Sequence, residues 1–178
     1  MKTIKIASIP ADGIGPEVIS AGIEVVEAVC ARNHDVTIEF THFDWGSDYY
    51  KTHGMMMPED GLAQLKAFDA IYFGAVGAPD VPDHITLWGL RLPICQGFDQ
   101  YANVRPTKII PGIASPLRGV EVGDLDWIIV RENSEGEYSG HGGRSHKGMP
   151  EEVGTEVAIF TRAGVARIMR FAFSMAAS

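Results

Sequence analysis

The feature that most constrains the fold is a strand pattern, a glycine turn and a helix pattern that follow one another at the start of the chain. TIKIASI at 3–9 alternates and is rich in β-branched residues, which predicts a strand. PADGIGPEV then turns the chain into a helix that begins near Pro16, with Glu17 in its first turn, and runs to about Arg32. This order of elements opens a βαβ unit.

Two further strand patterns continue the alternation. VTIEFTHF at 36–43 predicts a second strand, and AIYFGAV at 70–76 predicts a buried third strand. A helix is expected between them in PEDGLAQLKAF at 58–68. Strands that alternate with helices at this spacing predict an α/β fold, with a parallel sheet and helices on both of its faces.

The pattern changes after a short helix expected at 85–95, and we place a domain boundary near Gln96 to Phe98. The second part contains three extended segments without long helices between them: QYANVRPTKIIPG at 100–112, DLDWIIVREN at 124–133, and GTEVAIFT at 154–161. The Gly-rich GHGGRSHKGMP at 140–150 is expected to be an exposed arm or turn, within an arm near 139–160. The sequence therefore predicts two domains, at 1–97 and 98–178.

The last helix pattern, at 161–178, is apolar on more than one face from Val165 onward. Such a helix is expected to be buried on several sides. It reaches Ser178 without a glycine cap or a polar tail, so we expect the chain to stop in the middle of its architecture.

Charge and composition exclude several classes of protein. The formal net charge is -8, whereas a nucleic-acid-binding protein carries a basic footprint. No apolar run reaches the length that a membrane span needs, and the start of the chain has no signal-peptide core. Cys30 and Cys95 lie far apart without a CxxC pair, which favours two reduced thiols in a cytoplasmic protein.

The turn at 12–17, DGIGPE, superficially resembles a dinucleotide-binding fingerprint, because a Gly-rich turn opens a helix after a strand. It lacks the third glycine, Pro16 occupies the helix start, and Glu17 would repel a pyrophosphate from the helix N-terminus. A tight turn is the preferred interpretation.

Four cations and one tyrosine are the candidates for chemistry. Two arginine forks that converge from different segments could hold the two carboxylates of a diacid, and the cations in question are Arg91, Arg105, Lys108 and Arg131. For any one of them alone, a solvated surface residue is the preferred interpretation, although Arg105 precedes a proline and Arg131 ends a strand expected to be buried. Tyr138, in RENSEGEYSG, could donate a proton, or it could simply pack its ring and bond its hydroxyl.

Four motifs together resemble a known family. ADGIGPE, GAVGAP, FDQYANVRP and VRENSEGEYSG occur in this order and are similar to the β-decarboxylating dehydrogenases, the group of isopropylmalate, isocitrate, D-malate and tartrate dehydrogenases. The resemblance extends from Lys5 to Ala177. DHITLWG at 83–89 and EYSGHGGR at 137–144 resemble the tartrate and D-malate branch most.

The resemblance implies a non-Rossmann, isopropylmalate dehydrogenase-like two-domain fold. It also implies NAD-linked oxidation of a 2-hydroxy dicarboxylic acid, helped by Mg²⁺ or Mn²⁺ and by K⁺, and often followed by decarboxylation. Tyr138 matches the family's proton donor, and Arg105 and Arg131 match two arginines that bind the substrate's carboxylates. Gly13, Ile14 and Trp88 lie where the family packs near the nicotinamide.

The sequence departs from the family at one arginine and in length. Cys95 stands where relatives carry a third arginine, and Arg91 lies one helical turn earlier, either as a replacement or as a reader of the substrate's distinguishing group. Family chains are about twice as long, and the residues that the resemblance places after Ser178 include the catalytic lysine and the aspartates that ligate the metal. We therefore expect no metal site here, a first domain completed by absent segments, and no activity from this chain alone.

The resemblance further implies a homodimer formed through the second domain and its arm. Two alternatives stay open. One is an isopropylmalate dehydrogenase, whose apolar substituent would sit badly against Arg91. The other is a non-catalytic fragment that binds a diacid or regulates a partner subunit.

Overall fold

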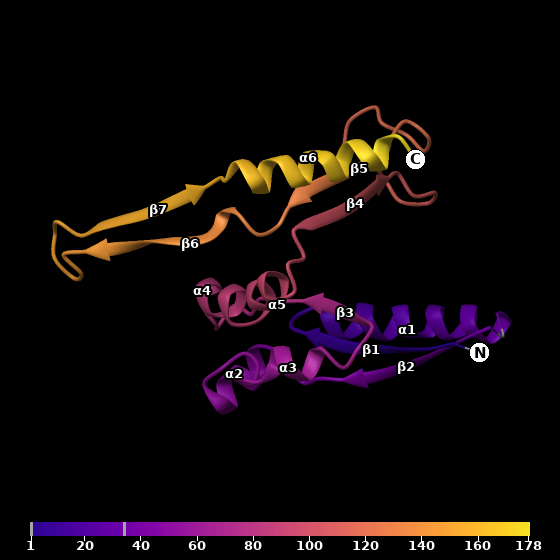
Figure 1. Cartoon of the computed structure of the whole chain (residues 1–178), viewed down its shortest axis with the longest axis horizontal. Coiled ribbons are helices and arrows are strands. Elements are labelled where there is room, and N and C mark those ends of the chain that lie inside the picture. The colour runs from indigo at the N-terminus through magenta and orange to yellow at the C-terminus, as the bar shows by residue number, and fades with distance from the viewer. Residues whose placement is uncertain (1, 34) are drawn as a thin grey trace. The chain divides into compact units, whose positions relative to one another are not determined.

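The computed structural model describes residues 2–33 and 35–178, and its chain forms two compact units, at 1–97 and 98–178 (Figure 1). The elements of the first unit are β1 (Lys2–Ala11), α1 (Gly15–Arg32), β2 (Val36–His42), α2 (Ser47–His53), α3 (Gly61–Leu65), β3 (Ala70–Ala75), α4 (Asp83–Thr86), the π-helical turn η1 (Leu87–Arg91) and α5 (Leu92–Gly97). Those of the second are β4 (Ala102–Lys108), β5 (Asp126–Glu132), β6 (Gly136–Ser145), β7 (Val153–Ile159) and α6 (Arg162–Ala176).

The first unit is built on a parallel sheet with the strand order β2-β1-β3, which confirms the predicted parallel pairing. The central strand β1 pairs Ile6 with both Phe40 and Ala70. Because the chain leaves β1 to one side for β2 and returns to the other for β3, the strand order reverses direction between β1 and β3. Open α/β sheets bind ligands outside the carboxyl ends of the strands at such a point.

Helix α1 packs along this sheet, in contact with β1, β2 and β3. Ser8 on one face of β1, and Ala7 and Ile9 on the other, are each 0% exposed, so both faces of the central strand are covered. The first turn of α1 comes very close to the backbone of the sheet. A Cβ on Gly15 would collide with the carbonyl oxygen of Pro10 and lie 2.9 Å from the Ala75 nitrogen. Glycine is therefore required where α1 leaves the end of the sheet.

Three local predictions differ from the structure. The helix expected at 58–68 is limited to α3, because the hydrogen bonds that follow, from Ala67 to Gln64 and from Phe68 to Leu65, tighten to i→i−3 spacing. The helix α2 was not predicted, since SDYYKTH has no apolar period. The helix expected at 85–95 is three consecutive segments with a π-helical turn in the middle, where the Leu92 N–H bonds to the Leu87 carbonyl.

The second unit consists of two antiparallel pairs, β4–β5 and β6–β7, with α6 packed beside β5 (Figure 1). The β6–β7 ribbon is the predicted arm, although β6 extends through Ser145, so strand replaces part of the expected turn. The expected burial of α6 on several sides is not reached within the described residues. Phe173 is 72% and Met169 51% exposed, because within this unit α6 packs against β5 on one face.

Candidate functional site

Arg105 and Arg131 lie on one face of the β4–β5 pair. Arg131 stands opposite Asn103, and Arg105 stands opposite Ile129. Opposed residues of an antiparallel pair share a face, as do residues two apart on one strand, so the two arginines are diagonal neighbours. The fold thus places on one face of the strand pair two arginines that are 26 positions apart in the sequence.

The surroundings of these arginines are more open than the sequence suggested. Arg105 is exposed and Arg131 is half-buried. The strand β5 is not buried among the described residues, since Trp127, Ile128 and Ile129 are between 48% and 56% exposed. Lys108, the fourth cation of the series, forms an exposed ion pair of 3.0 Å with Asp126 across the same strand pair.

Arg131 and Tyr138 contact each other directly. One terminal nitrogen (Nη2) of the Arg131 guanidinium donates to the Tyr138 hydroxyl, and the guanidinium carbon lies 4.9 Å from the centroid of the tyrosine ring. The hydroxyl oxygen accepts this hydrogen bond, so its own proton is left to donate elsewhere. A guanidinium beside the oxygen also stabilises the negative charge that would remain after the proton leaves.

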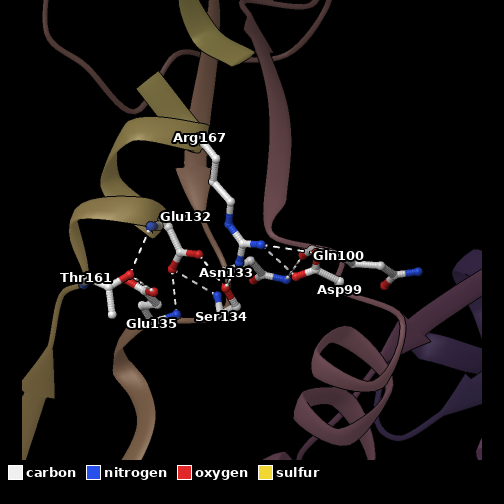
Figure 2. A network of polar contacts seen from close by, with 9 residues as sticks. Asp99, Gln100, Glu132, Asn133, Ser134, Glu135, Thr161 and Arg167 are labelled. Carbon is white, nitrogen blue, oxygen red and sulfur yellow. Dashed lines mark hydrogen bonds and ion pairs between the residues drawn. The ribbon is translucent and has the colours of Figure 1, made fainter. Parts of the chain in front are cut away.

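The residues between this pair form a tight turn closed by Glu132 (Figure 2). One carboxylate oxygen of Glu132 accepts from the N–H groups of Ser134 and Glu135, at 2.9 and 2.7 Å, and the other accepts from the Ser134 hydroxyl at 2.6 Å. Burial acts to raise the pKa of Glu132. The hydrogen bonds from the Ser134 hydroxyl and from backbone N–H groups outweigh it, and the pKa lies below its ordinary value.

Two polar contacts join this turn to the segment before β4. Asn133, which is 4% exposed, donates its backbone N–H to the Tyr101 carbonyl at 2.9 Å and its side-chain N–H to the Gln100 carbonyl at 3.2 Å. Arg167 of α6 bonds both Asp99 and Ser134 (Figure 2). Sequence patterns did not indicate Arg167.

Glu135 attaches the turn to the start of α6. Its carboxylate accepts from the Thr161 N–H at 2.9 Å and from the Thr161 hydroxyl at 2.6 Å, and that hydroxyl in turn accepts from the Gly164 N–H at 2.9 Å. A Cβ on Gly164 would collide with the Glu135 carboxylate. The threonine before an apolar helix is the one signal in the sequence that could have indicated this cap.

In the first unit, Gly13 and Ile14 lie in the turn between β1 and α1, at the carboxyl end of the sheet. The preceding Asp12 is 8% exposed, and its carboxylate accepts from the Ser47 N–H and hydroxyl, both at 2.7 Å, and from the Gly77 N–H at 2.9 Å. Asp12, which sequence patterns did not single out, therefore fixes three loops at this edge. Ile14 is 56% exposed.

Trp88 and Arg91 lie on the π-helical turn η1. Trp88 is partly exposed and lines a cavity of about 470 Å³ whose described lining residues do not include Gly13 or Ile14. The other lining residues are Tyr50, Gly54, Met55, Met56, Met57, Pro58, Glu59, His84, Ile85 and Gly89. Cys95, on the following helix, is a half-buried free thiol, as is Cys30.

Residues 2–33 and 35–178 lack two features that would define the class of site. No group of three or more His, Cys, Asp or Glu side chains in this part of the chain is arranged to hold a metal ion. No helix within the same residues is long and apolar enough to span a membrane.

Comparison with known proteins places this geometry in a family. The model for isocitrate/isopropylmalate dehydrogenase matches residues 5–178. The chain belongs to the isocitrate/isopropylmalate dehydrogenase family. The resemblance inferred from the four motifs is confirmed.

Individual relatives point to the same branch as the motifs. The chain is 76% identical over 176 residues to a probable tartrate dehydrogenase/decarboxylase of Agrobacterium vitis, covering 99% of this chain and 49% of that protein. It is 52% identical over 180 residues to the decarboxylating D-malate dehydrogenase of Escherichia coli (strain K12), covering 100% of this chain and 50% of that one. The chain thus spans about half the length of the curated relatives it matches.

The fold of the family is also found in solved structures. An isocitrate dehydrogenase from Methylococcus capsulatus matches with a TM-score of 0.79 at 28% identity, over 97% of this chain and 47% of that one. The predicted α/β, isopropylmalate dehydrogenase-like fold is therefore confirmed.

Proposed function

We propose that this chain supplies the carboxylate-binding arginines and the proton donor of a decarboxylating dehydrogenase that acts on a 2-hydroxy dicarboxylic acid, tartrate or D-malate. The observation that carries the proposal is the contact between Arg131 and Tyr138 beside Arg105 on the β4–β5 face. The names of the relatives, a tartrate dehydrogenase/decarboxylase and a D-malate dehydrogenase, support the substrate class.

Binding of the diacid uses the two arginines. Each guanidinium presents a planar fork of N–H donors that matches a carboxylate, and two forks on one face can hold two carboxylates of one small molecule. Since Arg131 also donates to the Tyr138 hydroxyl, a carboxylate bound by Arg131 lies next to the proton that the reaction needs.

Tyr138 acts in the second half of the reaction. Oxidation at C2 gives a 2-oxo diacid, and loss of CO₂ breaks the bond to the β-carboxylate and leaves its electron pair in an enolate. The enolate carbon takes the Tyr138 proton and becomes the 2-oxo acid product. The phenolate left behind is stabilised by the Arg131 guanidinium.

The family resemblance implies NAD, which when bound would supply the hydride acceptor, and Mg²⁺ or Mn²⁺, which would polarise the substrate's hydroxyl. Toward NAD, Ile14 and Trp88 each leave apolar surface exposed, which supports the proposed place of these residues, together with Gly13, beside the nicotinamide. The described residues do not form a metal site by themselves. The involvement of K⁺ remains a prediction of the family resemblance.

Arg91 is the proposed determinant of which diacid binds. It is half-buried at the end of η1 and carries a charge where an isopropylmalate dehydrogenase needs room for an apolar substituent. Tartrate or D-malate, whose distinguishing groups are polar or small, suits it better. We also propose that the protein is cytoplasmic, and that it works as a homodimer paired through the second unit and its β6–β7 arm.

The test is turnover by the protein as its gene encodes it, with intact mass recorded on the same sample. NADH formation at 340 nm is followed with NAD, Mn²⁺, K⁺ and tartrate, D-malate or isopropylmalate. We expect turnover of tartrate or D-malate. Tyr138→Phe should lower the rate at which the decarboxylated product forms about 10²- to 10⁴-fold. Arg131→Lys should raise KM about tenfold or more, because a single ammonium replaces a fork.

Arg118→Lys is the matched control, since Arg118 is exposed and lies outside the proposed site. Turnover of isopropylmalate alone would overturn the substrate assignment. Binding of tartrate or D-malate by calorimetry without any turnover would favour the non-catalytic diacid-binding function instead. The 178-residue chain assayed alone tests the prediction that it is inactive.

A further inference from the structure

Arg167 joins two segments of the second unit that are far apart in the sequence. One terminal nitrogen (Nη1) donates to both carboxylate oxygens of Asp99, at 2.9 and 3.1 Å, and the other (Nη2) donates to the Ser134 hydroxyl at 2.8 Å. Figure 2 shows the guanidinium between these two partners, with α6 supplying the arginine. The fork reaches the two partners from two separate nitrogens held in one plane, whereas the ammonium of a lysine would have to direct the N–H groups of a single nitrogen at both.

An aromatic ring fixes the guanidinium from a third side. Its carbon lies 4.4 Å from the centroid of the Tyr101 ring, and that ring meets Phe171 of α6 edge-on at 6.3 Å. The Tyr101 carbonyl also accepts the N–H of Asn133, in the turn that Arg167 holds. Arg167 therefore has one position defined by α6, by the start of β4 and by the turn after β5.

A continuous series of hydrogen bonds leads from Arg167 to Tyr138. The Ser134 hydroxyl, which accepts from Arg167, donates to Glu132, and Glu132 accepts the N–H groups of Ser134 and Glu135. The Glu135 carbonyl then accepts the Tyr138 N–H at 3.2 Å. The position of Ser134 is thus coupled through hydrogen bonds to the backbone conformation between Arg131 and Tyr138.

Stability alone does not account for this arrangement. The side chain of Asp99 is 69% exposed and that of Arg167 is 33% exposed, and ion pairs of this kind contribute little to folding because water and salt screen them. The Arg167 guanidinium instead favours one conformation of the turn, the one in which Asp99 and Ser134 both reach it.

We propose that Arg167 is a positioning residue for the Arg131–Tyr138 pair. By holding Asp99 and Ser134 together, it sets the turn that places the Tyr138 hydroxyl against the Arg131 guanidinium. The proposal rests on the function proposed above, because the pair is there assigned to diacid binding and proton donation.

The kinetic experiment compares Arg167→Lys with Arg170→Lys in the protein as its gene encodes it. Arg170 lies on the same helix and is exposed, so the control makes the same change one turn away. We expect Arg167→Lys to lower kcat for decarboxylated product about 10- to 100-fold, the effect of misplacing a reacting group by about 1 Å, and Arg170→Lys to leave it unchanged. A loss of equal size in both variants would contradict the proposal.

A double variant separates positioning from a general structural role. If Arg167 acts through Tyr138, then adding Arg167→Lys to Tyr138→Phe should lower kcat less than twofold further. Full multiplication of the two losses would mean that Arg167 acts on something other than Tyr138, and the proposal would be wrong.

A spectroscopic measurement keeps the proposal testable without turnover. Tyrosine labelled with ¹³C at the carbon that bears the hydroxyl gives one signal per ring, and Tyr138→Phe identifies the signal of Tyr138. We expect Arg167→Lys to shift that signal and Arg170→Lys to leave it in place. An unmoved signal overturns the proposal. A shifted signal in a protein that does not turn over either diacid supports the positioning role and refutes the proposed function.

Discussion

The two units differ in whether they bury apolar side chains. Among the described residues, every buried apolar side chain belongs to the first unit, and these are Ala7, Ile9, Ile19, Trp45, Met56, Leu65, Val81, Leu90, Leu92 and Ile94. The first unit also buries the polar residues Ser8, Asp12, Ser47 and Thr86. In the second unit the buried side chain is polar, that of Asn133, and it lies in a turn held by hydrogen bonds.

This difference indicates which forces position each set of proposed site residues. In the first unit, Trp88 lies on η1 close to buried Leu90, and Gly13 and Ile14 follow Asp12, whose carboxylate bonds fix the turn beside the apolar core. In the second, Arg131 and Tyr138 are the two ends of a turn whose carboxylates bond to N–H and hydroxyl groups. Substitutions that open cavities should therefore lower the stability of the first unit most. Substitutions that remove or displace the carboxylates of the turn should lower the stability of the second.

Truncation of the apolar core should have the largest effect on stability. Leu90 is 0% exposed, so Leu90→Ala removes buried methyl groups and leaves a cavity, and we expect a loss of about 2–5 kcal/mol in the free energy of unfolding. Urea unfolding measured by tryptophan fluorescence, with buried Trp45 as the reporter of the first unit, gives this value. Leu117→Ala is the matched control, because Leu117 is 53% exposed and should change the free energy by less than about 0.5 kcal/mol. If Leu90→Ala and Leu117→Ala lowered the free energy of unfolding equally, apolar burial would not be what stabilises the first unit.

A smaller loss is expected from Gly164→Ala in the second unit. The new methyl group would displace the Glu135 carboxylate and break the cap at Thr161, which should cost about 1–3 kcal/mol. Faster hydrogen exchange at the start of α6, with the first unit unchanged, would localise the loss. Gly143→Ala makes the same change where an added Cβ meets nothing within 4 Å and should cost less than about 0.5 kcal/mol. If exchange rises in the first unit as well, the units are not independent.

The same contrast explains what the sequence could predict. Local periodicity indicated β1, β2, β3 and α1, because a strand or helix repeats its apolar positions within a few residues. Periodicity cannot show contacts between distant residues. Asp12 meets Ser47 and Gly77 across 35 and 65 positions, and Arg167 meets Asp99 across 68.

The site was predicted in part for the same reason. The resemblance to a family indicated Arg131 and Tyr138, but their contact depends on a turn that closes only when Glu132 and Glu135 find their donors. The π-helical turn that carries Trp88 and Arg91 has no pattern of its own in LWGLR, and a regular helix was expected there.

Acid should weaken the second unit through Glu132. Its pKa in the folded chain is lowered, so its stabilising contribution is complete above the ordinary value of 4.5 and is lost as the pH falls through the lowered pKa. We expect Glu132→Gln to cost less than about 1 kcal/mol at pH 7, because the side chain is partly exposed, and this difference from the unsubstituted protein should shrink below pH 4.5. Urea unfolding at several pH values measures it. A difference that grows toward low pH would have the wrong sign for this mechanism.

The smallest effect is expected for a charged contact of the first unit, the ion pair of 2.9 Å between Lys51 and Asp80. Hydrogen bonding to Asp80 and then to Asp48 raises the pKa of Lys51, and the bond to Lys51 lowers the pKa of Asp80, but the two side chains are 43% and 63% exposed to solvent. Water and salt screen such a pair, so Lys51→Gln should leave the urea midpoint unchanged at 0.15 M salt. The substitution sharpens the comparison because it removes a charge contact where apolar packing sets the structure. If Lys51→Gln destabilised the first unit as much as Glu132→Gln destabilises the second, polar contacts would hold both units, and the contrast between them would fail.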